Sequence, residues 1–241
     1  MDARRKDIHN SDIPVICTAC EARHRGVCGA LSSDQLQTLS KSASRKKLGS
    51  GAELVGESLA TSSYSNIIVG VVQLVTMLAD GRQQIVGLQF APDFLGRPFR
   101  AESSLTAEAA TDVSVCTFPK TVIERMISDT PELEHRLLEQ TLKELDEARD
   151  WMVTLGRKTA AEKVASFLLL IATNADPENE SDSAEFDLPL TRLDIADFLG
   201  LTIETVSRQM TKLRKEAVIE VRNNRHVIVP DLNALADMAG N

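Results

Sequence analysis

Hydrophobic residues in the middle of the chain are gathered in short runs that turn signals separate. β-Branched and other hydrophobic residues predict three strands, at 66–75, 84–90 and 113–118. Between the first two, Asp80-Gly81 is a dipeptide typical of a tight hairpin turn. Short strands at this spacing between 46 and 118 favour a small antiparallel roll or barrel.

The residues before this region predict little regular structure. Residues 1–16 form a charged, irregular lead-in, and the cysteines and glycines of 17–30 are interpreted as a loop. Ser33 to Leu39 has the spacing of a short helix, for which Ser33 is the expected N-cap.

Helical spacing returns after Pro119. Thr130-Pro131-Glu132 predicts a helix start, because threonine caps helices, proline suits the first position and glutamate favours the N-terminal end. Two interleaved seven-residue series predict a stripe along this helix: Leu138, Thr141, Leu145, Ala148, Met152 and Leu155. The stripe suits packing within the chain or a dimer interface. A long helix between two domains favours the dimer, through Leu138, Leu145, Ala148, Met152 and Leu155.

A second helix follows, with Val164, Leu168 and Ile171 on one face. The polar, acidic stretch 174–185 after it is interpreted as an exposed loop.

Residues 190–215 have the pattern of a helix-turn-helix. Thr191 and Asp194 predict a capping box, and Gly200 a left-handed residue that ends the first helix. Three small or hydrophobic residues are expected to be buried in that helix: Ile195, Ala196 and Leu199. Thr202 is the expected cap of a second helix, whose inward face is Val206, Met210 and Leu213.

The outward face of that second helix has the side chains of a DNA-reading helix. We expect DNA contacts from six residues: Thr202, Glu204, Thr205, Ser207, Arg208 and Lys212. Arginine can bond guanine bidentately and a carboxylate can accept from cytosine, whereas lysine holds phosphates. Strand-like residues at 218–221 and 227–229, around Asn223-Asn224, predict a hairpin wing.

The distribution of charge agrees with contact to DNA at one end only. The chain has a net charge of −8, but residues 203–225 carry six basic and three acidic side chains. A basic segment on an acidic protein is typical of a site-specific regulator, although a solvated helix face would have the same charge.

Composition narrows the class of protein. The chain has 241 residues, enough for two domains, and 43% of them are hydrophobic. No hydrophobic run is long enough to span a membrane and the N-terminus has no signal-peptide pattern, so a cytoplasmic protein is expected. The sequence has no Walker A motif, no complete GxGxxG and no HExxH, and we expect no enzymatic activity.

The cysteines supply the candidate chemistry. Their pattern is Cys17-x2-Cys20-x7-Cys28, with Cys116 far away in the chain. Four thiolates suit a [4Fe–4S] cluster or a zinc ion, and free thiols are a third alternative that the spacing leaves open. The four histidines are scattered and are interpreted as surface residues.

Residues 191–215, TRLDIADFLGLTIETVSRQMTKLRK, resemble the DNA-binding domain of the CRP/FNR superfamily of transcription regulators. The resemblance also covers QQIVGLQFAPDFLG at 83–96, LGRKTAAEKVASFLLLI at 155–171 and ALADMAG near the C-terminus. Within the superfamily, Ile203-Glu204-x-x-Ser207-Arg208 is similar to the FNR-type, oxygen-sensing branch of the alphaproteobacterial kind.

The resemblance implies a function and a cofactor. It implies a homodimer that binds double-stranded DNA at an inverted repeat resembling TTGAT-N4-ATCAA. It also implies a [4Fe–4S] cluster on Cys17, Cys20, Cys28 and Cys116 that senses oxygen, although the x7 gap departs from the family's more familiar five residues. The alternative is a thiol- or zinc-dependent regulator of the same fold. The Asp80-Gly81-Arg82 hairpin resembles the loop that family activators present to RNA polymerase.

The same comparison argues against a cyclic-nucleotide ligand. The family's nucleotide-binding members use a Gly-Glu-Leu segment and an Arg-Ser pair for the phosphate. Here residues 96–109 read GRPFRAESSLTAEA, with Arg97 in place of the glutamate and Ser104-Leu105 near the place of the Arg-Ser pair. Without that arginine the phosphate lacks its main charge partner, so we expect no cyclic nucleotide to bind.

Together these features predict an α+β fold. We expect a cysteine-bearing segment over 1–30 and an antiparallel β-roll, similar to cyclic-nucleotide-binding domains, over 31–118. A long dimerisation helix region at 119–158 and a winged helix-turn-helix at 159–241 follow. We hypothesise that the cluster clamps residues 17–28 against Cys116 and favours dimerisation through the helix at 131–155.

Overall fold

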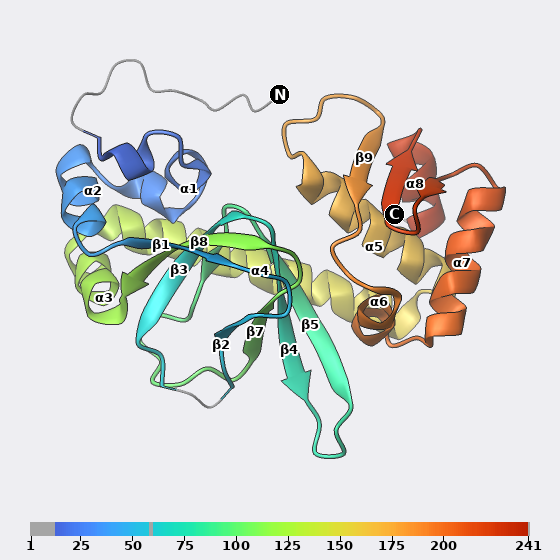
Figure 1. Ribbon diagram of the computed structural model, residues 1–241, viewed down its shortest axis with the longest axis horizontal. Coiled ribbons are helices and arrows are strands. Elements are labelled where there is room, and N and C mark those ends of the chain that lie inside the picture. The colour runs from blue at the N-terminus through green and yellow to red at the C-terminus, as the bar shows by residue number, and fades with distance from the viewer. Residues whose placement is uncertain (1–12, 58–59, 241) are drawn as a thin grey trace. The chain divides into compact units, whose positions relative to one another are not determined.

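The computed structural model describes residues 13–57 and 60–240 (Figure 1). The chain folds into two compact units. The first comprises the described residues up to 76 together with 86–145, and the second comprises 77–85 and the described residues from 146 onward. The boundary falls within one long helix, α4 (Pro131–Arg157).

The first unit is built on a β-roll. In the described part of the chain, one sheet has the order β1-β8-β3-β6 and a second the order β2-β7-β4-β5. The strands of the first sheet are β1 (Ser44–Leu48), β8 (Val113–Pro119), β3 (Ser63–Val69) and β6 (Phe94–Leu95). Those of the second are β2 (Glu53–Val55), β7 (Thr106–Ala109), β4 (Val71–Met77) and β5 (Gln83–Phe90). Hydrophobic residues of both sheets, including Ile67, Val72 and Val115, are buried together between them.

One detail of the predicted roll is wrong. The single strand predicted at 66–75 is two strands, because the chain turns at Gly70, whose φ is 93°. A side chain there would bring its Cβ to 2.4 Å from the Asp112 carbonyl oxygen, so the turn requires glycine. The strands predicted at 84–90 and 113–118 correspond to β5 and β8, with small differences at their ends.

The cysteine-bearing segment is not the loop that was predicted. It forms three short helical turns: η1 (Val15–Cys17), α1 (Glu21–His24) and η2 (Val27–Ala30). The following helix, α2 (Ser33–Ser40), is capped by Ser32 and not by Ser33. The Ser32 hydroxyl accepts from the Gln35 amide, and the Gln35 side chain accepts from the Ser32 amide, so a capping box fixes the start one residue earlier.

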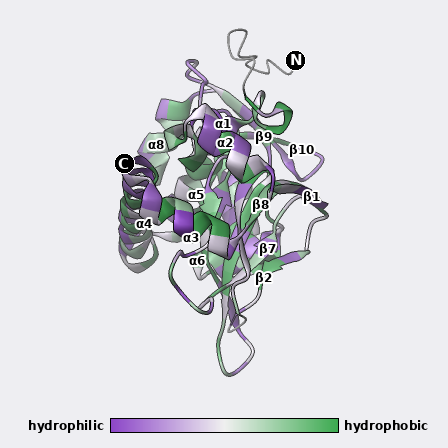
Figure 2. Cartoon of the chain, turned by 90° about the vertical axis from the view of Figure 1, so that its left-hand side faces the viewer, coloured by the Kyte–Doolittle hydropathy of each residue, from purple (hydrophilic) through white to green (hydrophobic). Residues whose placement is uncertain are grey.

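Helices cover one side of the roll next to the cysteine segment. The core there includes Leu36 and Leu39 of α2, Phe118 of β8, and Ile123 of α3 (Lys120–Asp129). Helix α3 carries both hydrophobic and hydrophilic bands, as expected of a helix with one buried face (Figure 2). Helix α4 begins at Pro131, as predicted.

The second unit contains a winged helix-turn-helix. Its helices are α5 (Ala160–Ala175), α6 (Arg192–Leu199), α7 (Ile203–Lys215) and α8 (Leu232–Ala239). A sheet of order β10-β11-β9 joins β10 (Glu220–Arg222), β11 (His226–Val229) and β9 (Ala184–Asp187). Phe198 of α6 packs on the rings of Trp151 and Phe167. Val164, Leu168 and Ile171 are buried as predicted.

Two predicted ranges in this unit need correction. The acidic loop expected to reach residue 185 ends earlier, because Ala184–Asp187 pairs with β11 as a third strand of the wing. The first wing strand begins at Glu220 and not at Val218, whose amide instead donates to the Leu213 carbonyl at the end of α7. Among the helices formed by residues 13–57 and 60–240, none is both long and apolar enough to cross a membrane.

Candidate functional site

The turn between α6 and α7 has the geometry that its sequence predicts. The Thr191 hydroxyl accepts from the Asp194 amide at 3.2 Å, and the Asp194 carboxylate accepts from the Thr191 amide at 3.0 Å. Gly200 ends α6 in the left-handed region, with φ 61° and ψ 42°. The Thr202 hydroxyl then accepts from the Thr205 amide at 3.2 Å and caps α7. Both helix boundaries are therefore fixed by local chemistry.

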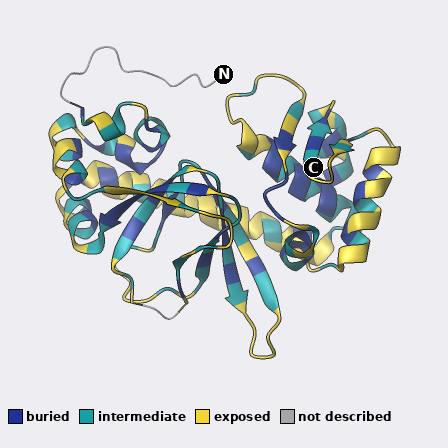
Figure 3. Cartoon of the chain, viewed as in Figure 1, coloured by how far each residue is buried: buried dark blue, intermediate teal, exposed yellow. Residues whose placement is uncertain are grey.

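Helix α7 has one buried face and one open face. Val206, Met210 and Leu213 are buried against the rest of the unit, as predicted. Figure 3 shows the exposed colour along much of the rest of this helix. Five of the six candidate DNA-contacting residues are exposed: Thr202, Glu204, Ser207, Arg208 and Lys212. Thr205 is half-buried.

Hydrogen bonds connect the side chains at the start of α7. The Arg208 guanidinium donates to the Thr205 hydroxyl at 3.2 Å, and the Thr202 and Thr205 hydroxyls are also 3.2 Å apart. The pKa of Glu204 is held below its usual range by its own backbone amide and by the Thr202 hydroxyl. Glu204 is therefore a carboxylate at neutral pH, and it can accept a hydrogen bond from a base.

The wing follows this helix in the sequence and carries further basic residues. Asn223 and Asn224 have φ of 50° and 58°, the left-handed pair that a type I′ hairpin turn requires. Arg222 and Arg225 flank the turn. Arg222 is ion-paired with Glu220 at 3.2 Å, and the Arg225 guanidinium donates to the Leu188 carbonyl at 3.1 Å.

Sequence reasoning missed the role of His226, which was interpreted as a surface residue. Its two ring nitrogens lie 2.9 Å from Asp187 and 2.7 Å from Glu185, both on β9. Hydrogen bonds with these carboxylates raise the pKa of His226, so the imidazolium ties β9 to β11. Of the other histidines, His24 is also half-buried, His135 is exposed, and His9 lies outside the described residues. No local signal indicated the His226 contacts, because they depend on a long-range strand pairing.

The structure brings the four cysteines together around one cavity. Cys17 ends η1, Cys20 precedes α1, Cys28 lies in η2, and Cys116 lies on β8. All four are free thiols and line a cavity of about 20 Å³, which Leu36, Leu39 and Phe118 also enclose. Three cysteines near the N-terminus and one on a distant strand therefore share one site, as the resemblance implies.

Burial raises the pKa of two of the thiols at this cavity. Burial raises the pKa of Cys28 to about 12, and the nearby Cys20 contributes in the same direction. Burial likewise raises the pKa of Cys116 to about 11, again with Cys20 contributing. Cys28 and Cys116 are therefore neutral thiols at pH 7, and a bound cation would be needed to favour their thiolates.

The donor set suits an iron–sulfur cluster or a single zinc ion. Four thiolates are the ligands that a [4Fe–4S] cluster uses. Tetrahedral zinc requires all its ligands to converge at about 2.3 Å on one point. In the part of the chain that the structure describes, no three Cys, His, Asp or Glu side chains converge in that way.

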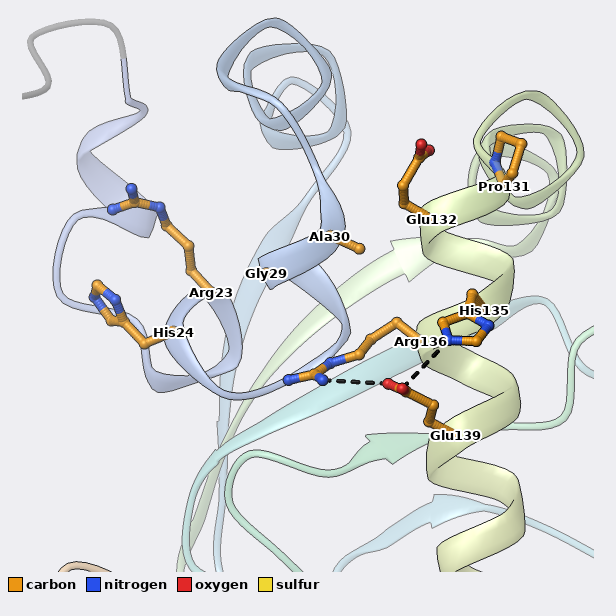
Figure 4. A pocket seen from close by; sticks show the side chains of 9 residues that line it. All are labelled: Arg23, His24, Gly29, Ala30, Pro131, Glu132, His135, Arg136 and Glu139. Atoms are coloured by element: carbon orange, nitrogen blue, oxygen red, sulfur yellow. Dashed lines mark hydrogen bonds and ion pairs between the residues drawn. The ribbon is translucent and has the colours of Figure 1, made fainter.

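A groove separates the cysteine segment from the start of α4 (Figure 4). It has a volume of about 570 Å³, with Arg23 and His24 on the segment and His135, Arg136 and Glu139 on α4. Glu139 is ion-paired with Arg136 at 3.3 Å, and its carboxylate also lies 3.3 Å from a ring nitrogen of His135. The Arg136 guanidinium also donates to the Arg25 carbonyl at 3.1 Å. The cysteine segment therefore has a direct hydrogen bond to α4.

The predicted stripe on α4 is exposed. The exposed fractions are 53% for Leu138, 44% for Leu145, 72% for Met152 and 37% for Leu155, and Ala148 is exposed as well. Figure 3 shows the exposed colour along much of this helix. Within its own unit the stripe is therefore not buried, and the dimer interface through it stays a prediction.

The roll interior contains a small cavity. It has a volume of about 70 Å³ and is lined in part by Leu74, Gln89, Arg97 and Leu105. The Arg97 guanidinium donates to the Ser104 hydroxyl at 3.3 Å. The absence of a cyclic-nucleotide ligand stays a prediction.

Comparison with known proteins gives the family. The profile of the Crp-like helix-turn-helix domain matches residues 162–238. A probable transcriptional activator of Rhizobium leguminosarum bv. viciae is 58% identical over 99% of both chains. The chain belongs to the CRP/FNR family of DNA-binding transcription regulators. Another member of the CRP/FNR family, the transcriptional activator protein FnrL of Cereibacter sphaeroides, is 42% identical over 95% of both chains.

Solved structures agree with this assignment to the CRP/FNR family. The structure of FixK2 from Bradyrhizobium japonicum superimposes with a TM-score of 0.73 at 30% identity, covering 81% of this chain and 96% of FixK2. The resemblance to the CRP/FNR family and the predicted fold class are thus confirmed.

Proposed function

We propose that this protein is an oxygen-responsive transcriptional activator that binds, as a homodimer, an inverted repeat resembling TTGAT-N4-ATCAA. In this proposal Cys17, Cys20, Cys28 and Cys116 hold a [4Fe–4S] cluster that controls dimerisation. The observation that carries it is the meeting of these four thiols at one buried cavity. The relatives named as activators support activation as the regulatory effect.

The cysteine segment is the element that would connect the cluster to the rest of the chain. When bound, the cluster supplies an oxygen-labile covalent link among the four thiolates. As its ligands, Cys17, Cys20 and Cys28 would hold their segment to Cys116 on β8. Arg136 holds the same segment to α4 through the Arg25 carbonyl. A change in the position of the segment can therefore reach the dimer helix through this bond and through the core that Val27 and Cys28 share with Leu133.

The exposed stripe on α4 is the proposed dimer contact. Leucine and methionine side chains exposed along one helix are costly in water and favour burial against a second copy. A two-fold dimer would place two copies of α7 for successive major grooves, which suits an inverted repeat. Loss of the dimer would leave one recognition helix per protein, which would bind DNA with much lower affinity.

Base reading is assigned to the first turns of α7. Arg208 is exposed and suits guanine O6 and N7, and the Glu204 carboxylate suits cytosine N4. We assign contacts with the DNA backbone or base edges to Thr202, Thr205 and Ser207, and a phosphate contact to Lys212.

The hairpin at Asp80-Gly81-Arg82 is the proposed contact for RNA polymerase. Arg82 is ion-paired with Asp80 at 2.8 Å, and both side chains are largely exposed. Gly81 has φ 86°, which holds the turn in a left-handed conformation. An exposed, charged turn of this kind is suited to protein contact.

Iron and absorption measurements on anaerobically purified protein test this proposal. We expect about four irons and four sulfides per chain, with a band near ~400 nm that bleaches in air. Changing any one of the four cysteines to alanine should remove the band. A colourless protein with one zinc would favour the zinc-dependent alternative, and would leave the DNA-binding assignment intact.

A further inference from the structure

Three side chains form a row across the first sheet of the roll. Cys116 on β8 lies directly opposite Arg45 on β1 and directly opposite Asn66 on β3. Residues directly opposite one another in antiparallel strands project from the same face of the sheet. The row Arg45–Cys116–Asn66 therefore faces one way, with the cysteine at its centre.

Each outer residue of the row contacts one end of the cysteine segment. The Arg45 guanidinium donates to the carbonyl of Ile16, immediately before Cys17, at 2.6 Å. The Asn66 side-chain amide donates to the Cys28 sulfur at 3.1 Å. The first and last cysteines of the segment are thus held on opposite sides of Cys116.

Asn66 occupies a place where an apolar side chain would be expected. It is 1% exposed and lines the cysteine cavity, and its amide oxygen has no hydrogen-bond partner among the described residues. A leucine would fill a similar volume without burying an unpartnered oxygen. The amide is therefore kept at a cost in stability, and its contact with Cys28 is what it provides.

We propose that Arg45 and Asn66 are positioning residues that dock the two ends of the cysteine segment against Cys116 before any cofactor is bound. The value of this docking for cluster assembly rests on the proposed [4Fe–4S] site. The docking itself is a property of the chain alone, because both contacts form between protein atoms. With all four thiols already gathered, less conformational entropy is lost when the cluster binds.

Hydrogen exchange of the full-length, iron-free chain tests the docking directly. The Arg23 and Arg25 amides are hydrogen-bonded within the segment and report its opening. We expect Asn66→Leu and Arg45→Ala each to speed their exchange about fivefold, the effect of losing one ordinary hydrogen bond. Arg45→Lys, which keeps a charged donor, should restore part of the protection.

Ser65→Ala is the matched control. Its hydroxyl lies 3.0 Å from that of Thr117, in the neighbouring cross-strand pair on the other face of the same strands. This variant should leave exchange in the segment unchanged. Arg45 is exposed, so its replacement tests the proposal even if Asn66→Leu does not fold. Wild-type exchange rates in both Arg45→Ala and a folded Asn66→Leu would overturn the docking.

Anaerobic reconstitution separates this inference from the proposed function. The docking variants should take up iron several-fold more slowly than the wild type. Asn66→Leu should also lower the reduction potential, because a hydrogen bond to a ligating sulfur stabilises the more negative state. If the wild type takes up no iron, the proposed function fails while hydrogen exchange still decides the docking. If exchange is unchanged while a cluster forms normally, the docking fails and the proposed function stands.

Discussion

The Arg136 side chain on α4 donates to the Arg25 carbonyl in the cysteine segment at 3.1 Å. This bond joins the element that holds three of the cysteines to the helix that carries the exposed stripe. Arg136→Ala should therefore weaken the effect of oxygen on dimerisation while leaving iron content unchanged. Sedimentation of the iron-loaded and air-treated variant measures that effect.

His135→Ala is the control for this prediction. A ring nitrogen of His135 lies beside the Glu139 carboxylate, whereas the bond to the Arg25 carbonyl comes from Arg136. The control variant should respond to oxygen as the wild type does. If oxygen changes the dimerisation of both variants equally, Arg136 does not connect the cysteine segment to dimerisation.

The stripe on α4 predicts how dimerisation can be blocked. Leu145→Asp places a charge in the middle of the exposed hydrophobic series, and burying an unpaired carboxylate against a second copy is strongly unfavourable. We expect the iron-loaded variant to sediment as a monomer with its absorption band intact. Lys143→Asp changes charge on the same helix two positions away and should dimerise. A dimeric Leu145→Asp protein would place the interface elsewhere.

Replacing Arg208 and replacing Lys212 should weaken DNA binding in different ways. Arg208→Ala is expected to cost about 1–3 kcal/mol of binding free energy at the matched repeat and to relax preference at the base pair that it reads. Lys212→Ala should weaken binding to all sequences alike and reduce the dependence of log K on log salt by about 1. Titrations with matched and substituted duplexes at several salt concentrations distinguish these outcomes. Identical losses of preference in the two variants would contradict the assignment.

The wing should be more stable when His226 is protonated. Its carboxylate partners, Asp187 and Glu185, raise the pKa of His226 above the ordinary value of 6.5. The stabilisation is therefore complete below pH 6.5 and is lost as the pH rises through the higher folded-state pKa. Urea unfolding at a series of pH values measures this. His226→Gln should remove that component of the pH dependence, whereas His135→Gln should retain it.

The sequence predicts the DNA-binding unit well because its signals are local. The Thr191–Asp194 capping box, the Gly200 turn and the inward face of α7 depend on residues within a few positions of one another. Such contacts are encoded in spacing, and the structure reproduces them.

The cysteine site could be predicted only in part. The spacing shows which residues are ligand candidates, but the Arg45–Cys116–Asn66 row depends on the register of three strands. The contact of His226 with β9 has the same origin, since 41 positions separate His226 from Glu185. Long-range register is fixed by packing and turn geometry, which a single sequence does not display.

The most direct test of the central claim is a DNA-binding titration before and after exposure to air. Anaerobically purified protein is titrated against a labelled duplex carrying TTGAT-N4-ATCAA, and iron is assayed on the same samples. We predict tight binding with about four irons per chain, and a loss of affinity of at least about tenfold when air removes the iron. Unchanged affinity after complete loss of iron would contradict control of DNA binding by the four-cysteine site.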